Sequence, residues 1–270
     1  MSPLRKIALV VNPAKPGASR LGGELADIAR ARGLEVVQTD SHPVPDEFLA
    51  GCDACCVLGG DGTILGAVSS AVRHGVPIFG INRGKLGFLA NYPAESAAQG
   101  FGSVLDGDFR RVEVSLLECV TADGRVYPAL NDIVIKTRDV FRLARLGVHD
   151  DHGFVNTYRA DGLIFSTPTG STAYNLGAGG PLILPEASVF VMTPICPHTL
   201  SNRAVIFPAC VNIRVEKEDP SSHLVVSVDG HDPLGGDLFP LVIRSSPARL
   251  PILRPRGLSH FDILRAKLKW

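Results

Sequence analysis

The residues Ala54–Thr63, ACCVLGGDGT, decide the class of fold. The apolar run Ala54–Leu58 has the length and continuity of a buried strand, and Gly-Gly-Asp-Gly-Thr follows it directly. A helix is expected from this loop to about Arg73, where His74-Gly75 ends it. An apolar strand, a glycine-rich loop and a helix in this order predict an α/β domain with a parallel sheet.

The same rhythm continues on both sides of this stretch. Further strands are expected at Lys6–Val11, Leu34–Gln38 and Val76–Gly80, with a helix at Leu21–Arg32. Continuous apolar strands that alternate with amphipathic helices predict a Rossmann-like parallel sheet with both faces covered. We expect this α/β domain to span residues 1–110.

Past about residue 111 the sequence changes to short strand-like runs divided by turn residues. The strands expected there are Val112–Val120, Val126–Leu130, Ile133–Lys136, Leu143–His149, Gly153–Tyr158, Leu163–Ser166, Val189–Thr193, Ala204–Phe207, Val211–Val215 and Leu224–Val228. One helix is expected among them, at Ser171–Leu176. The pattern predicts a second, mainly antiparallel β domain over 111–254. Phe261–Lys269 again has helical spacing and is expected to return to the first domain, adding about 255–270 to it.

Composition excludes several classes of function. The chain has 270 residues, and its 27 Lys and Arg equal its 27 Asp and Glu, so no wide basic field for nucleic acid is expected. No run approaches the roughly 18 apolar residues that cross a membrane, and the N-terminus lacks the charged and apolar segments of a signal peptide.

Six cysteines indicate the redox environment. Cys52 and Cys55 form a C-x-x-C, but no second Cys or His pair stands at zinc spacing. Because the pair runs into the apolar segment Cys55–Leu58, a buried strand with reduced thiols is favoured over a metal or redox site. We therefore expect a soluble cytoplasmic protein.

The glycine-rich loop carries the first candidate chemistry. Gly59 and Gly60 let the backbone approach a ligand closely, and free N–H groups at the next helix start favour anionic oxygens. Asp61 follows a strand of an open α/β sheet, where ligands bind, and could take a proton from a sugar hydroxyl. The alternative is an Asp-Gly turn capped by Thr63 that needs no ligand. The loop is neither a P-loop nor a G-x-G-x-x-G fingerprint.

Three later segments are rich in polar groups. Asn131-Asp132 offers the donors and acceptors that hold a vicinal diol, but for the pair by itself a turn before a strand is the favoured interpretation. Arg159–Pro181 is dense in hydroxyls and includes Tyr174, which could stack on a base; a plain Ser/Thr loop is the alternative. Thr193–Arg203 contains two prolines, His198 and Arg203, for which a structural role is favoured.

These segments, in this order and at these separations, resemble the NAD kinase family. Its G-G-D-G-T loop, Asn-(Glu/Asp) pair, D-G-x-x-x-S-T-P-T-G-S-T-A-Y motif and T-P-x-x-P-H-x-L-S-x-R motif stand at Gly59–Thr63, Asn131-Asp132, Asp161–Tyr174 and Thr193–Arg203. Gly80–Leu89 is similar to the family's G-I-N-x-G-x-L-G-F-L, and the ending Leu268–Trp270 resembles its L-G-W. The resemblance covers the chain from about residue 57 to its end.

The resemblance implies transfer of a phosphoryl group from ATP or polyphosphate, escorted by Mg²⁺, to the 2′-hydroxyl of NAD's adenosine ribose. It implies a homodimer or homotetramer whose sites share residues between subunits. Asp61 would be the general base, and the donor loop would comprise Gly59, Gly60, Gly62 and Thr63. The residues that the resemblance assigns to NAD are Asp61, Gly62, Asn131, Asp132, Arg142, Arg159, Asp161, Thr169, Thr172, Ala173, Tyr174, Asn175, Leu176, Gly177 and His231. It assigns no protein ligand to a metal.

Within that assignment, Asn131 and Asp132 would hold ribose hydroxyls, Thr172–Asn175 would form the adenine and nicotinamide pockets, and Asp161 would meet the carboxamide across a subunit boundary. The chain departs from the family at two positions. The family often has D-G-Q where this chain has Asp229-Gly230-His231, so His231 replaces a glutamine and one ligand contact is in doubt. Asn175 stands where serine is common.

Two other functions compete with this interpretation. A diacylglycerol, sphingosine or sugar-phosphate kinase shares a related Gly-Gly-Asp-Gly loop, but those families lack the Thr172–Tyr174 segment. A non-enzymatic dinucleotide-binding regulator would not need the intact Asp61. The sequence leaves open the choice of donor and the choice between NAD and NADH.

Overall fold

The computed structural model describes residues 4–82, 86–139, 142–199, 201–231, 233–236 and 238–269. Two compact units divide the chain, one made of Met1–Glu113 with Leu250–Trp270 and the other of Val114–Arg249. Within the described residues, no helix is long and apolar enough to cross a membrane.

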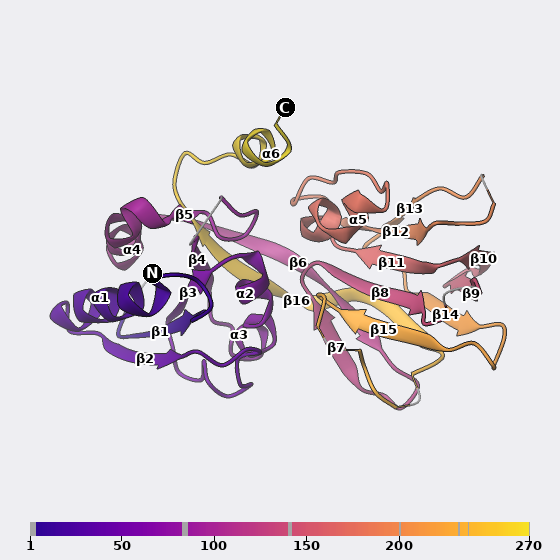
Figure 1. Ribbon diagram of the computed structural model, residues 1–270, viewed down its shortest axis with the longest axis horizontal. Helices are drawn as coiled ribbons and strands as arrows, with labels where there is room; N and C mark the ends of the chain where they lie inside the picture. The colour runs from indigo at the N-terminus through magenta and orange to yellow at the C-terminus, as the bar shows by residue number, and fades with distance from the viewer. Residues whose placement is uncertain are drawn as a thin grey trace. The chain divides into compact units, whose positions relative to one another are not determined.

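The first unit is built on a parallel sheet. Its main strands are β1 (Lys6–Val11), β2 (Glu35–Thr39), β3 (Ala54–Gly59) and β4 (Ile78–Asn82), in the spatial order β2-β1-β3-β4 (Figure 1). All three pairings between these strands are parallel, and β4 also pairs with the short β5 (Tyr92–Pro93). The predicted parallel sheet and its four strands are confirmed.

Helices cover both faces of that sheet. Helices α1 (Ala18–Ala31) and α4 (Ala97–Leu105) share one core with alternate residues of β1, β3 and β4. On the opposite face, Ile64 packs so closely over Gly80 that a Cβ at Gly80 would lie 2.7 Å from its Cδ1. Cys55 and Cys56 are fully buried within β3, and burial raises the pKa of both thiols.

The prediction of a single helix from the glycine-rich loop to Arg73 is wrong. The segment forms two helices, α2 (Asp61–Leu65) and α3 (Val68–His74). The break falls at Gly66, whose carbonyl accepts the N–H of Val44 at 2.9 Å and against which the ring of His42 packs. A long-range contact therefore ends α2 after little more than one turn.

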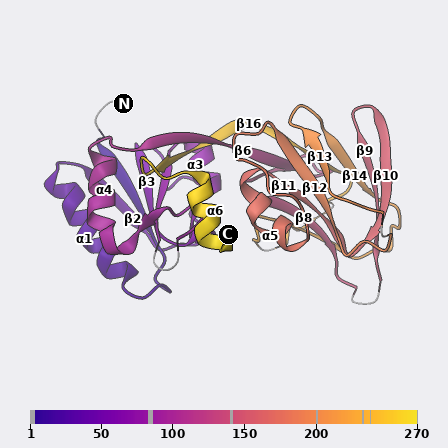
Figure 2. The ribbon, with the colours of Figure 1, turned by 90° about the horizontal axis from the view of Figure 1, so that it is seen from above.

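The second unit consists of two sheets that enclose one apolar core (Figure 2). One sheet has the order β13-β12-β11-β8-β15, and the other contains β10-β9-β14-β16 with β6 and β7. The strands are β6 (Arg110–Val120), β7 (Val126–Ala129), β8 (Asp132–Thr137), β9 (Ala144–Asp150), β10 (Gly153–Ala160), β11 (Gly162–Ser166), β12 (Val189–Ile195), β13 (Val205–Pro208), β14 (Ile213–Lys217), β15 (Leu224–Val228) and β16 (Leu241–Arg254). The described pairings among these strands are antiparallel, which confirms the predicted β-rich class. The end of β16 belongs to the first unit, where Ile252 pairs in parallel with Ile78 of β4.

Three elements differ from the sequence prediction or were not expected. The helix expected at Ser171–Leu176 is a 3₁₀ turn, η2 (Thr169–Thr172), followed by the single turn α5 (Tyr174–Gly177). Strand β16 and helix α4 were not expected. The C-terminal helix is present as α6 (His260–Leu268) within the first unit, and Ser259 opens it with a capping box.

Candidate active site

The glycine-rich loop of the first unit is tightly packed. The side chain of Thr63 fills the space in which a Cβ of Gly59 would lie, so glycine is required there. The Thr63 hydroxyl accepts a hydrogen bond of 3.1 Å from the Asn12 amide at the end of β1. The carboxyl ends of the neighbouring strands β1 and β3 are thus joined at the edge where α/β sheets bind ligands.

Asp61 is fixed by the backbone of a second loop. Its Oδ2 accepts the N–H of Phe88 at 2.9 Å, and its Oδ1 accepts those of Leu89 and Ala90 at 3.0 Å each. A Cβ at Gly87 would collide with Oδ1, so only glycine allows this approach. A carboxylate offers about four acceptor positions. Three of them are occupied by these backbone N–H groups, two on Oδ1 and one on Oδ2.

These three backbone hydrogen bonds to Asp61 were not predicted. The sequence predicted Asp61 in a loop before a helix that runs to about Arg73, with the free N–H groups at the helix start favouring anionic oxygens. The observed α2 has five residues, so its dipole is small, and the three N–H groups from 88–90 supply the local positive field instead. The only signal in the sequence is the glycine pattern around Gly87.

In the second unit, the backbone of Asn131 is held by the hydroxyl-rich segment. The Thr167 hydroxyl donates to the carbonyl of Leu130 at 2.6 Å, and the Thr167 N–H donates to that of Asn131 at 2.9 Å. The Ser166 hydroxyl reaches the Asn131 carbonyl at 3.3 Å. A side chain at Gly170 would collide with the same carbonyl. The Asn-Asp pair and the S-T-P-T-G run are therefore parts of one structure.

Asp132 is a buried carboxyl with 5% of its surface exposed. Burial raises its pKa to about 7, the neighbouring Asp229 carboxylate adds to the rise, and the backbone N–H of Tyr174 opposes it. The contact with Tyr174 joins the start of β8 to the start of α5. The structure thus brings Asp132 together with the Thr172–Asn175 segment, as the resemblance implies.

The side chain of Asn175 is wholly engaged inside the protein. Its Nδ2 donates to the carbonyls of Ser171 and Pro181 at 3.1 and 3.0 Å, and its Oδ1 accepts the Thr193 hydroxyl at 2.6 Å. Gly180 packs directly against the amide. Because the residue is fully buried with its hydrogen-bonding groups satisfied, its side chain ties α5 to the segments around it from within.

Its neighbours around α5 are more accessible. The ring of Tyr174 is 41% exposed and available for stacking. Thr169 is buried, and its backbone carbonyl accepts the Thr172 hydroxyl at 3.2 Å. Leu176 is half-buried and Gly177 exposed.

Three predicted residues lie at the other end of the β domain's strands. Arg142 precedes β9, Arg159 lies near the end of β10, and Asp161 follows it; Ala160 pairs with Ala144, so all three share one end of the β9–β10 pair. Asp161 precedes β11 and Ser166 ends it, a separation of roughly 16 Å at the usual rise per residue. Within one chain these three residues lie away from Asn131 and Asp132.

His231 lies near Asn131-Asp132, on the turn after β15. Its Nδ1 is 3.0 Å from the carbonyl of Val228, and the ring is half-buried. Val228 pairs with Ile133 on β8, directly beside Asp132. At this turn the sequence pointed only to the departure from the family at His231. No role was predicted for Asp229, which lies between Val228 and His231.

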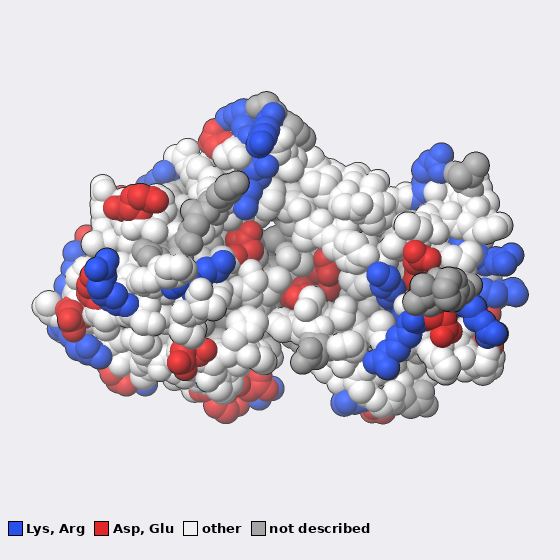
Figure 3. Space-filling model, viewed as in Figure 1, with Lys and Arg blue, Asp and Glu red and all other residues white. Residues whose placement is uncertain are grey.

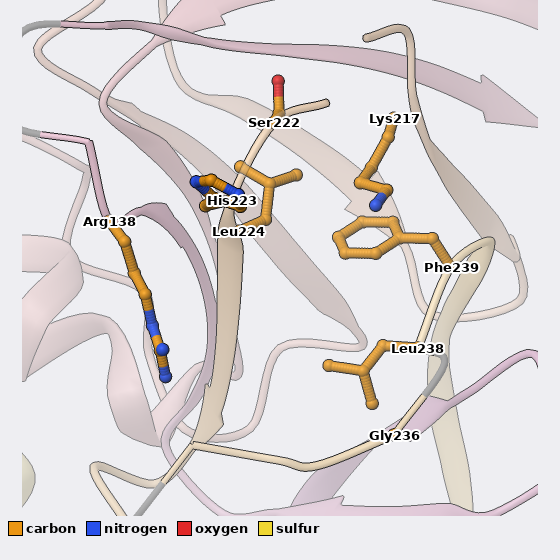
Figure 4. Close-up of a pocket in the computed structure, with 8 residues that line it drawn as sticks. All are labelled: Arg138, Lys217, Ser222, His223, Leu224, Gly236, Leu238 and Phe239. Carbon is orange, nitrogen blue, oxygen red and sulfur yellow. The ribbon is translucent and has the colours of Figure 1, made fainter. Parts of the chain in front are cut away.

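A separate cavity of about 520 Å³ lies elsewhere in the second unit (Figure 4). Arg138, His223 and Lys217 line it with the apolar Leu224, Leu238 and Phe239, and the Lys217 ammonium lies 5.6 Å from the centre of the Phe239 ring. None of the residues that the sequence assigned to a site is among its lining residues. On the face shown in Figure 3, cationic and acidic side chains are interspersed.

Two family models match the chain. The N-terminal domain of ATP-NAD kinase matches residues 41–109, and the C-terminal domain of ATP-NAD kinase matches residues 130–238. Among curated relatives, an NAD kinase of Solibacter usitatus is 35% identical, with 99% of this chain and 98% of the relative covered. An NAD kinase of Shewanella sp. strain MR-4 is 36% identical, with coverage of 98% and 91%.

Solved structures give the same result. The yeast NADH kinase complexed with NADH matches with a TM-score of 0.86 and 26% identity, over 100% of this chain and 88% of that one. An NAD kinase from Archaeoglobus fulgidus in complex with ATP matches with a TM-score of 0.80 and 25% identity, over 98% of both chains. Sequence motifs, fold and relatives therefore agree, and the chain belongs to the NAD kinase family, a family of phosphotransferases that convert NAD to NADP.

Proposed function

We propose that this chain transfers the γ-phosphoryl group of ATP to the 2′-hydroxyl of the adenosine ribose of NAD, with Asp61 as the general base. The observation that carries the assignment of Asp61 is its three backbone hydrogen bonds, which orient the carboxylate and leave one acceptor position on Oδ2. The solved relatives bind NADH and ATP, which supports the choice of both substrates.

In the proposed step Asp61 accepts the 2′-hydroxyl proton as the oxygen attacks the γ-phosphorus. The bond from that phosphorus to the β–γ bridging oxygen breaks, ADP leaves with the electron pair, and Asp61 later returns the proton to water. Phosphoryl transfer depends mostly on alignment and charge neutralisation, and general-base help adds about 10²–10⁴-fold. Gly59, Gly60, Gly62 and Thr63 form the donor loop. Gly60 and Gly62 have open space where a Cβ would stand, which lets phosphates approach the backbone there.

A divalent cation, Mg²⁺, is proposed to enter with the donor. Mg²⁺ is usually held through substrate phosphates, water and at most one or two carboxylates. As in the sequence assignment, no protein ligand is assigned to the ion. The ion would neutralise phosphate charge; the chain's own part is to orient the acceptor.

The acceptor is assigned to the second unit. Asn131 and Asp132 hold ribose hydroxyls, and Thr169, Thr172, Ala173 and Tyr174 form the base pocket, with Leu176, Gly177 and His231 beside it. Asn175 supports this pocket through the hydrogen bonds of its buried side-chain amide. In domain terms, residues 1–110 with about 255–270 handle the donor and 111–254 bind NAD. The six free cysteines support a cytoplasmic location.

Arg142, Arg159 and Asp161 complete the pocket of a second subunit in this proposal. Within one chain they lie at the opposite end of β11 from Ser166, away from Asn131 and Asp132. This separation supports a homodimer or homotetramer in which two subunits share each site. Co-expression of Asp61→Asn and Asp161→Ala chains tests it, because only a mixed oligomer then contains a complete site. A random dimer would regain about a quarter of wild-type activity. If the mixture stays as inactive as either variant alone, the sites are not shared.

An assay of NADP formation tests the function directly. The purified chain is incubated with Mg²⁺, NAD or NADH, and either ATP or polyphosphate, and the 2′-phosphorylated product is measured. We expect the wild type to form product, and Asp61→Asn to lose about 10²–10⁴-fold in kcat while it still binds NAD. Absence of product with every donor would refute the proposed activity, and near-normal kcat in the variant would refute the role of Asp61.

A further inference from the structure

Asp229 holds three consecutive backbone N–H groups from a distant part of the chain. Its Oδ2 accepts the N–H of Leu130 at 2.8 Å, and its Oδ1 accepts those of Asn131 at 2.7 Å and Asp132 at 3.1 Å. In return, the Asp229 N–H donates to the carbonyl of Asp132 at 2.9 Å. Only 8% of the residue is exposed.

The backbone at this turn is also unusual. Asp229 has φ of +52° and Gly230 has φ of +71°, so two successive residues adopt the left-handed conformation. For a non-glycine residue this conformation is uncommon, although Asp and Asn tolerate it best. The turn directs the Asp229 carboxylate under the Leu130–Asp132 segment. Three N–H groups need two acceptor oxygens, which an Asp side chain provides and an Asn side chain does not.

The Leu130–Asp132 segment is thereby held on both sides. Thr167 bonds to the carbonyls of Leu130 and Asn131, while Asp229 takes all three N–H groups and donates to the third carbonyl. Every backbone polar group of the segment has a partner, so the backbone is fixed before any ligand arrives. Fixing a recognition segment in advance reduces the ordering cost of binding.

We propose that Asp229 is a positioning residue for the acceptor substrate, which holds Asn131 and Asp132 in the one orientation that meets the ribose diol of NAD. The inference rests on the proposed function, which assigns those two side chains to ribose hydroxyls. Asp229 itself is buried beneath the segment and acts through Asn131 and Asp132.

The charge of Asp229 gives this role a measurable signature. The titratable groups around Asp132 are Asp229 and, beyond it, His231, which lowers the pKa of Asp229; the N–H of Tyr174 is the further polar contact. Burial raises the pKa of both carboxyls, but three N–H groups stabilise the Asp229 anion and one stabilises that of Asp132. The backbone N–H groups therefore favour the ionised form of Asp229 more than that of Asp132. Ionised Asp132 accepts a hydrogen bond from a ribose hydroxyl more strongly than the protonated carboxyl does, so NAD affinity should rise as pH passes about 7.

The variant Asp229→Asn tests the proposal. Asparagine keeps the size and the left-handed turn, but it removes the charge and one acceptor oxygen. Binding of NAD is measured by titration calorimetry without donor from about pH 5.5 to 8.5, together with kcat, KM and Tm. We expect the Kd for NAD to rise about tenfold, as for loss of one charge-assisted hydrogen bond, with little change in kcat. The pH midpoint of binding should fall, because the repulsion that raises the pKa of Asp132 is gone.

Asp53→Asn is the matched control. Asp53 accepts the backbone N–H groups of Arg5 and Lys6, both at 2.8 Å, in the first unit. Its substitution should lower Tm and leave the Kd and pH midpoint for NAD unchanged. If Asp229→Asn behaves in the same way, Asp229 is merely structural and the proposal is overturned.

Thr167→Val is a second variant that tests the same proposal if Asp229→Asn does not fold. It loosens the same segment from the carbonyl side without changing a charge, so it should weaken NAD binding and leave the pH midpoint in place. Wild-type affinity in this variant would overturn the proposal. A wild-type protein that fails to bind NAD would instead refute the proposed function, so the two failures can be distinguished.

Discussion

Gly87→Ala should disable the enzyme by displacing the carboxylate of Asp61. A Cβ at Gly87 would overlap Oδ1 and lie 3.0 Å from Cγ of Asp61 and 3.1 Å from the Ala90 nitrogen. Oδ1 is the oxygen that accepts two of the three backbone hydrogen bonds. Because the new methyl group faces backbone and a fixed carboxylate, Asp61 must move, and both bonds lengthen or break.

The magnitude follows from these contacts. Inserting a methyl group into a packed site costs about 1–3 kcal/mol of stability. A misplacement of about 1 Å at the reacting groups costs roughly 10²-fold in rate. We therefore expect kcat to fall about a hundredfold while the KM for NAD changes little, because the residues proposed to bind the ribose and the base belong to the other unit.

Steady-state kinetics of NADP formation, with Tm recorded for each protein, measure the effect. Gly23→Ala is the control, because Gly23 lies in α1 with nothing within 4 Å of its added Cβ; its kcat should stay normal. In an Asp61→Asn background, Gly87→Ala should cost little further activity, since both changes remove the same group. A folded Gly87→Ala protein with kcat within a few-fold of wild type would refute the three backbone hydrogen bonds to Asp61 as a catalytic requirement.

Three further outcomes are expected. The pKa of Asp132 is raised to about 7 in the folded protein, so the folded state binds the extra proton and its contribution to stability is lost as pH rises from about 4 through 7. Asp132→Asn should therefore flatten the fall in Tm over that range, and an unchanged slope would contradict the shift. Thr193→Val leaves the buried Oδ1 of Asn175 without its donor and should cost about 1–3 kcal/mol in denaturant unfolding, whereas an unchanged midpoint would show that the amide finds another partner. Tyr174→Ala removes an exposed stacking surface, so it should raise the KM for NAD with Tm nearly constant; an unaltered KM would exclude stacking on this ring.

Much of the fold follows from local patterns. The strands β1 and β3 consist almost wholly of continuous apolar runs, and the sequence shows the change from alternating strands and helices to strands alone. Strand β16 was not predicted because Ser245-Ser246-Pro247 resembles a turn. In the structure the Ser246 hydroxyl accepts the N–H of Ala248 at 3.2 Å and donates to Glu118, which supports the strand through this interruption.

Helix α4 was not predicted for a related reason. Its sequence, AAQGFGSVL, contains two glycines, which disfavour a helix by about 1 kcal/mol each. Ala97, Phe101 and Val104 nevertheless occupy one face and are buried against the parallel sheet. Tertiary packing of that face outweighs the weak local propensity.

The sequence by itself determined the family and the two fold classes, and it supplied the residues proposed to carry the chemistry, because those depend on residue types at short and regular spacing. Only the tertiary structure decided how these residues are held. The N–H groups that fix Asp61 lie 27 to 29 residues away, and those that fix Asp229 lie 97 to 99 residues away. No local pattern encodes such partners, since a backbone N–H is the same in every residue but proline. The fold alone brings those groups to the carboxylates, and it sets Asp161 at the other end of β11 from Asn131 and Asp132.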